Sequence, residues 1–236
     1  MVWQSVVNGQ TLKFRLSGIN NQNFIMKDEE SGSWWQQISG QAIQGPMKGA
    51  SLVPVDADEL TFSTWKRENP NGRVLRPDEV IKAEEKYEPV DWESQVAKMR
   101  VTTTAELDNV LPPRELIVGV VVNGKAKAYP FSAIQKQSPI LDTFGGRNIL
   151  VLLADDGKSV RIFERNVGAT KLEFLRNPES NELVDAETGS TWDFTGKATS
   201  GELAGSQLVK LGAIKDYWFD WKTYNPDTEL YRLGAR

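Results

Sequence analysis

The chain contains neither cysteine nor histidine among its 236 residues. Without cysteine it has no disulfide and no thiol nucleophile. Without histidine it has no imidazole base, no imidazole-bound zinc and no histidine-ligated haem. Any chemistry must use carboxylates, lysine, tyrosine, hydroxyl groups or the backbone. We therefore expect no metal centre and no cofactor, and the sequence points away from an enzyme without excluding one.

Long apolar runs and a one-sided charge are also missing. No segment approaches the roughly 20 uncharged apolar residues that span a bilayer, so we expect no membrane insertion. The N-terminus lacks the basic and then apolar pattern of a signal peptide. The 28 basic and 32 acidic residues are interspersed without a lysine or arginine stripe, which argues against a nucleic-acid partner.

Two long stretches of the chain, Asp28–Leu75 and Asp185–Tyr231, carry the same residues in the same order. They align with a single one-residue gap, and glycines, turn residues and tryptophans match throughout. The matching pairs are Asp28/Asp185, Glu30/Glu187, Gly32/Gly189, Ser33/Ser190, Trp35/Trp192, Gly40/Gly196, Gly45/Gly201, Gly49/Gly205, Leu52/Leu208, Trp65/Trp221, Asn69/Asn225 and Pro70/Pro226. The sequence therefore predicts two copies of one module.

Each copy predicts β-hairpins followed by one short helix. The Asp-x-Glu-Ser/Thr-Gly-Ser pattern between apolar stretches indicates a tight turn, because glycine adopts positive φ at little cost. Asn-Pro then ends the helix, and a strand is expected at 73–75 and at 229–231. We expect the matched tryptophans of strand and helix to be buried in both copies. The predicted fold class is mainly β (α+β with short helices), in two tandem β-rich modules.

The two modules are not expected to be equal. We predict an incomplete first module over 1–76, a charged and partly helical connector over 77–110, and a complete second module over 111–236. Leu111–Leu153 supplies a hairpin and a buried-type strand to the second module, and nothing corresponds ahead of the first. The first module should therefore present an open sheet edge. The connector, a second chain or preceding residues could cover it, and we favour a second chain.

Several motifs resemble the bacterial and archaeal domain-of-unknown-function 3179 family. They are the run LPPRELIVGVVVNGKAKAYPF, the turn DTFGG, the turn DAETGSTWD and the ending YWFDWKTYNPDTELY. The resemblance implies two modules, an export signal and hence a place outside the cytoplasm, with no established activity. Relatives carry paired cysteines before the strand that begins here at VWQ. Because this chain has none, a metal or redox role based on such cysteines does not carry over.

The acid pairs Asp28/Glu30 and Asp185/Glu187 are the most regular candidate site residues. Two carboxylates about 5–9 Å apart could serve glycoside hydrolysis. Acids at a hairpin tip more commonly bond the turn amides, which is the interpretation we favour. Trp34 is the candidate for ligand stacking, because it is adjacent to a core tryptophan on a strand and must point to the opposite face.

Two further patterns have weaker functional readings. Lys125, Lys127 and Tyr129 alternate along one strand and share one face. A lysine and the tyrosine could act as an acid–base pair, although solvated strand lysines are commoner. The Gly157-Lys158-Ser159 triplet suggests a phosphate loop, but it lacks the preceding glycine and should be followed by a strand. We interpret this triplet as part of a hairpin turn.

The function predicted from these observations is binding or scaffolding outside the cytoplasm without catalysis. The partner would be a second copy of the chain, joined through the open sheet edge, or another protein. One alternative is a carboxylate-dependent hydrolase of the glycosidase type. Another is a glycan-binding module that uses exposed tryptophan. A deep pocket in which two acids with shifted pKa values converge would favour the enzyme, and a largest concavity that is shallow and aromatic would favour binding.

Overall fold

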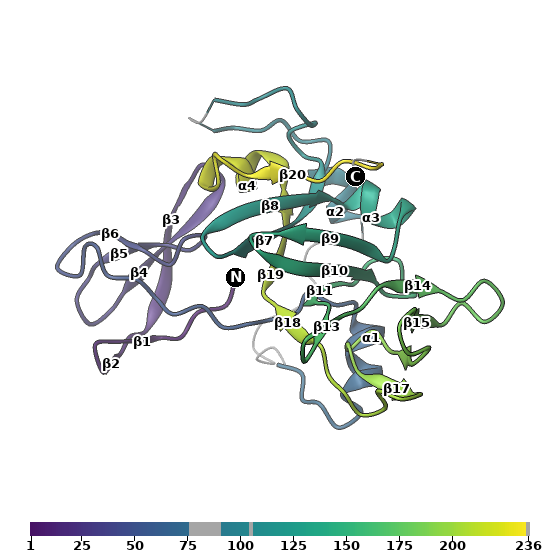
Figure 1. Ribbon diagram of the computed structural model, residues 1–236. Helices are drawn as coiled ribbons and strands as arrows, with labels where there is room; N and C mark the ends of the chain where they lie inside the picture. Colours follow the sequence, from purple (N-terminus) through teal and green to yellow (C-terminus); the bar gives the residue numbers. More distant parts are fainter. Residues whose placement is uncertain (76–90, 104–105, 235–236) are drawn as a thin grey trace.

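The computed structural model describes residues 1–75, 91–103 and 106–234, and it is mainly β with four short helices in that part of the chain (Figure 1). The helices are α1 (Phe62–Glu68), α2 (Trp92–Val96), α3 (Phe131–Lys136) and α4 (Trp218–Tyr224). The strands are β1 (Val6–Val7), β2 (Gln10–Thr11), β3 (Phe14–Asn20), β4 (Asn23–Asp28), β5 (Trp34–Gln36), β6 (Ala42–Gln44), β7 (Leu116–Val122), β8 (Lys125–Pro130), β9 (Ile140–Phe144), β10 (Arg147–Leu153), β11 (Val160–Glu164), β12 (Asn166–Val167), β13 (Thr170–Lys171), β14 (Phe174–Arg176), β15 (Leu183–Asp185), β16 (Thr191–Trp192), β17 (Ala198–Ser200), β18 (Val209–Leu211), β19 (Ala213–Tyr217) and β20 (Glu229–Leu230).

Two four-stranded sheets of the second half form the centre of the molecule (Figure 1). Their orders are β19-β7-β8-β20 and β18-β11-β10-β9, and all pairs are antiparallel except β20 with β8. Apolar residues of both sheets, such as Val118 and Ile149, share one core. The predicted Asn-Gly hairpin joins β7 to β8, with φ values of 50° at Asn123 and 76° at Gly124. Positive φ at both positions is what a two-residue hairpin turn requires.

Two smaller sheets contain the matched stretches. β3-β4-β5-β6 and β14-β15-β16-β17 are both meanders, and both have a bulge beside the matched tryptophan. Trp35 is 0% exposed and Trp192 is 4% exposed. Phe14 and Phe174 meet these indoles edge to face, with ring centroids 5.7 and 5.5 Å apart. These contacts are those that a duplicated module predicts, and the duplication itself stays a prediction.

The matched helices end as predicted but are not equally buried. Asn69 and Asn225 each donate a backbone N–H, at 2.9 Å, to the carbonyl of the matched tryptophan. Trp221 is 3% exposed and lies over Gly119 of β7. The expectation that Trp65 would be buried is wrong: it is only half-buried and stacks on the exposed ring of Phe62. No sheet like β7-β8 lies beneath it in the described residues.

The prediction of a strand at 73–75 is also wrong. Those residues have no strand partner and include Leu75, which is 96% exposed. The matched segment does form β20, because β8 lies beside it and accepts it as a parallel neighbour. A short segment with strand propensity needs such a neighbour to become a strand.

The connector expected over 77–110 is only partly visible. Residues 76–90 and 104–105 lie outside the described residues. In the described part, α2 forms within the stretch whose sequence indicated a helix. Among the residues that the structure describes, no helix has the length and apolar character needed to cross a membrane.

Candidate binding groove

The first half of the chain has an incompletely paired strand. In the second half, Phe163 of β11 pairs with Leu150 of β10 on one side and with Lys210 of β18 on the other. Trp3 takes the corresponding place, since its ring lies beneath Gly40 as the ring of Phe163 lies beneath the matched glycine. It forms a bridge with Pro54 on one side. No strand of the described chain lies on the other side of Trp3.

Among the residues that the structure describes, the hydrogen bonds of this bridge leave the outer backbone groups of Trp3 without a strand partner. Gln4 N–H donates to the Val53 carbonyl at 2.8 Å, and Val55 N–H donates to the Val2 carbonyl at 2.9 Å. In an antiparallel pair the residue between such bonds directs its own N–H and carbonyl to the opposite side. Met1–Ser5 therefore forms an open strand edge.

A groove of about 610 Å³ lies against this edge. Its walls are Met1–Trp3, the segment 54–59, and the outer face of β7 and β19 next to Trp221. Three valines that line it are strongly exposed: Val2 at 49%, Val55 at 40% and Val121 at 54%. Exposed apolar side chains gathered in one concavity mark a binding surface.

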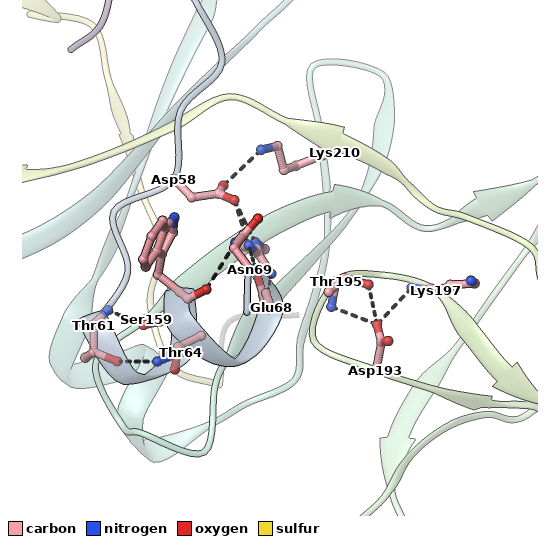
Figure 2. Close-up of polar contacts among 12 residues, drawn as sticks. Asp58, Thr61, Thr64, Glu68, Asn69, Ser159, Asp193, Thr195, Lys197 and Lys210 are labelled. Atoms are coloured by element: carbon pink, nitrogen blue, oxygen red, sulfur yellow. Dashed lines mark hydrogen bonds and ion pairs between the residues drawn. The ribbon is translucent and has the colours of Figure 1, made fainter. Parts of the chain in front are cut away.

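Ion pairs fix the groove wall formed by 54–59. Asp58 pairs with Arg161 at 2.7 Å and with Lys210 at 3.0 Å, as Figure 2 shows for Lys210. The same Arg161 pairs with Glu68 of α1 at 2.7 Å, and Glu59 pairs with Lys215 at 3.2 Å. Burial would raise the pKa of Asp58, but the hydrogen bonds from Arg161 and Lys210 outweigh it and hold that pKa below its usual value. The wall therefore stays charged and anchored at neutral pH.

The start of α1 is anchored to the turn between β10 and β11. Thr61 N–H donates to Ser159 Oγ at 3.0 Å (Figure 2). The hydroxyls of Thr61 and Thr64 donate to Asp156 at 2.6 and 2.8 Å. Burial acts to raise the pKa of Asp156, but the hydrogen bonds from Ser159, followed by those from Thr61 and the N–H of Lys158, bring it below its usual value. As predicted, the strand β11 and not a helix follows the Gly157-containing turn. This turn holds α1 in place.

The two predicted aspartates lie inside their turns. Asp28 is 1% exposed and accepts hydrogen bonds from the amides of the following turn and, at 2.7 Å, from Trp35 Nε1. Burial acts to raise its pKa, and these bonds, that from Trp35 first, bring it below the usual value. Asp185 is equally buried and receives Trp192 Nε1 at 2.8 Å. The carboxylate oxygens of Asp28 and Asp185 thus accept hydrogen bonds from their own turns and from the matched tryptophans.

The remaining predicted residues do not converge either. Glu30 accepts the N–H of Lys13, and Glu187 accepts the N–H of Glu173, both at 2.9 Å. Each glutamate thus holds the start of the neighbouring strand, β3 or β14, against its own turn. Trp34 is 37% exposed on the face opposite its buried neighbour, and it is not part of the groove. The structure therefore separates all five predicted residues from the groove.

Sequence analysis missed a pair of buried carboxyls, Asp216 on β19 and Asp220 on α4. Asp216 Oδ1 accepts the N–H of Tyr217 at 2.7 Å, and its Oδ2 is buried without a hydrogen-bond partner among the described residues. Asn23 Nδ2 donates to Asp220 Oδ1 at 2.5 Å. Burial, followed by the charge of Asp220, raises the pKa of Asp216 to about 8. Neither residue lines the groove. The available signal was the two acids within the aromatic segment DYWFDW.

Lys127 is also placed differently from its expected solvated position. It is 9% exposed, and its Nζ lies 2.6 Å from Asp142 of β9. The Tyr129 hydroxyl donates to the same carboxylate at 2.8 Å. Burial raises the pKa of Tyr129 above its usual value, so it remains a hydrogen-bond donor. This cluster is internal to the second half and fully paired.

Comparison with known proteins gives a family. No curated protein and no solved structure matches the chain. The family described as "Protein of unknown function (DUF3179)" matches residues 1–228, which is nearly the whole length. The match includes the motifs of both halves, the open edge at Met1–Ser5 and the groove. The chain therefore belongs to the DUF3179 family.

Proposed function

We propose that the protein is a non-catalytic binding and scaffolding protein that associates with a second copy of itself through the open edge at Met1–Ser5. The observation that carries this proposal is the one-sided pairing of Trp3, compared with the two-sided pairing of Phe163. An unpaired edge is a template for another strand, and main-chain bonds then supply affinity without special side chains.

Two identical edges can pair with each other across a two-fold axis. The pairing is antiparallel, each copy offers the same surface, and the contact closes at a dimer. The exposed valines beside the edge, Val2, Val55 and Val121, would lose water in the same step. Burying the exposed part of each contributes about 1 kcal/mol, which supports the main-chain bonds.

The groove lacks the features of a catalytic site. The acids with raised pKa values, Asp216 and Asp220, lie outside it. Of the acids in its wall, Asp58 and Glu59 are paired with cations. This favours binding over the carboxylate-dependent hydrolase. We infer a place outside the cytoplasm from the family resemblance.

Sedimentation velocity tests the proposal. The wild-type chain should sediment as a dimer that dissociates on dilution, and Val2→Lys and Val121→Lys should be monomeric, since each places a charge in the contact. Val209→Lys is the matched control, because Val209 is 57% exposed on β18 and outside the groove. It should remain dimeric. A wild-type chain that is monomeric up to high concentration, or a control that dissociates equally, would overturn the proposal.

A further inference from the structure

A second cavity, of about 660 Å³, opens beside the end of α1 and is separate from the groove. Its lining comes from 67–68 at the end of α1, 152–155 at the end of β10, 180–183 at the start of β15 and 191–195 at β16, together with Arg176 of β14 and Thr199 of β17. This volume is within the usual range of small-ligand sites, about 300–1,000 Å³. The cavity thus joins the helix of the first half to the small sheet of the second.

Hydroxyl groups line one side of this cavity. Thr191 Oγ1 lies 2.9 Å from Thr199 Oγ1 across the β16–β17 pair. Thr195 donates its hydroxyl to Asp193 at 2.6 Å (Figure 2), and Ser180 donates to Glu182 at 2.8 Å. Such hydroxyls can both donate and accept hydrogen bonds. Polyhydroxylated ligands need this combination.

Two charged side chains of the lining are free. Arg67 on α1 and Asp155 in the β10–β11 turn have no hydrogen-bond or ion-pair partner among the described residues. Glu68, by contrast, is neutralised by Arg161, and Asp193 accepts bonds within its own loop.

Arg176 donates to the carbonyls of Asn181 and Leu153 at 2.9 and 3.3 Å. Glu182 accepts from Ser180. Cations and anions thus both line the cavity, and the lining creates no strong field of one sign.

The lining also includes an apolar portion. Its partly exposed members are Leu153 and Phe194, whereas Leu152 and Leu183 are buried in the core. A sugar ring has an apolar C–H face and a rim of hydroxyls. A guanidinium donates to neighbouring hydroxyls, and a carboxylate accepts from them. The chemistry of this cavity therefore matches a neutral sugar better than a charged ligand.

We propose that the cavity beside α1 binds a short neutral oligosaccharide. Arg67 donates to its hydroxyls, Asp155 accepts from them, and the apolar residues take the C–H face of a ring. The site does not depend on strand pairing at Met1–Ser5, since the two cavities share no lining residue. Its occupation and the dimerisation proposed above can succeed or fail separately.

Isothermal titration calorimetry with four neutral trisaccharides tests the site: maltotriose, cellotriose, laminaritriose and tri-N-acetylchitotriose. At least one should bind, and Arg67→Ala and Asp155→Ala should each weaken it about tenfold or more, as loss of a charged hydrogen bond does. The controls are Arg73→Ala and Glu202→Ala, which change exposed charges outside the cavity and should leave affinity unchanged.

The opposite results are equally specific. Failure of all four trisaccharides to bind overturns the assignment, as does equal weakening by the control variants. Tetraalanine serves as the peptide probe, and its binding in place of the sugars would reassign the cavity to extended peptides. Sedimentation of Arg67→Ala and Asp155→Ala should remain that of the wild type, which separates this result from a failure of dimerisation.

Discussion

Replacement of Asp216 by asparagine should stabilise the protein in alkaline solution. The Asp216 carboxyl is buried against Asp220, and two carboxylates cannot both ionise there without repulsion. Asparagine has nearly the same shape, cannot ionise, and can donate its amide N–H to Asp220. The variant therefore keeps the contact of the protonated pair at every pH.

The size and sign of this change in stability with pH follow from the pKa of Asp216. It rises from 3.8 when unfolded to about 8 when folded, so the folded chain holds a proton that the unfolded chain releases between these values. Stability is therefore lost as pH rises through this window. At about 1.4 kcal/mol per pH unit the ceiling is about 6 kcal/mol, and relaxation of the pair should reduce it to about 2–4 kcal/mol.

Urea unfolding followed by tryptophan fluorescence at pH 5, 7 and 9 measures this effect. Asp216→Asn should exceed the wild type by about 2–4 kcal/mol at pH 9 and by much less at pH 5. Asp227→Asn is the control, because Asp227 is an exposed acid just beyond the end of α4, and it should have no pH-dependent effect. A difference between Asp216→Asn and wild type that does not change with pH would refute the reasoning.

Two other predictions concern packing. Trp35→Ala should lower the free energy of unfolding by about 3–5 kcal/mol, the half-buried Trp65→Ala by about 1–2 kcal/mol, and the exposed Trp34→Ala by less than about 1 kcal/mol. Chemical denaturation measures these losses, and three equal values would contradict the order of burial. Gly119→Ala would place its new Cβ 2.4 Å from the Trp221 ring, so α4 must shift. We expect the free energy of unfolding to fall by about 2 kcal/mol and the near-UV circular dichroism spectrum to change. An unaltered melting curve would show that the close contact is wrong.

Turns and helix ends were predictable because their chemistry is local. Asn123 and Gly124 form the expected hairpin, and Asn69 and Asn225 end the expected helices. Each of these outcomes depends on a few neighbouring residues. The favoured turn role of Asp28 is likewise a short-range matter of one carboxylate and the amides that follow it.

Burial was less predictable because it depends on what lies beneath a segment. Trp65 and Trp221 occupy matched positions in the sequence, yet only Trp221 has β7 below it. The carboxyls of Asp216 and Asp220 meet at a strand–helix junction, where spacing alone does not show that both are enclosed. The groove likewise arises only when Val2, Val55 and Val121 are brought together from distant parts of the chain.

The two halves hold each other through matched helices that use different chemistry. Thr64 of α1 contacts Asp156 of the second half, while Asp220 of α4 contacts Asn23 of the first. The carboxylate at α1 has a lowered pKa and stays ionised, whereas the pair at α4 holds a proton that alkali removes. The hydrogen bond from Asn23 favours the ionised form of Asp220, so above about pH 8 the repulsion should fall on the Asp216–Asp220 pair and not on the contact with Asn23. The ion pairs of Asp58 that anchor the groove wall keep their charge there, so strand pairing at Met1–Ser5 should persist where the Asp216–Asp220 pair is destabilised.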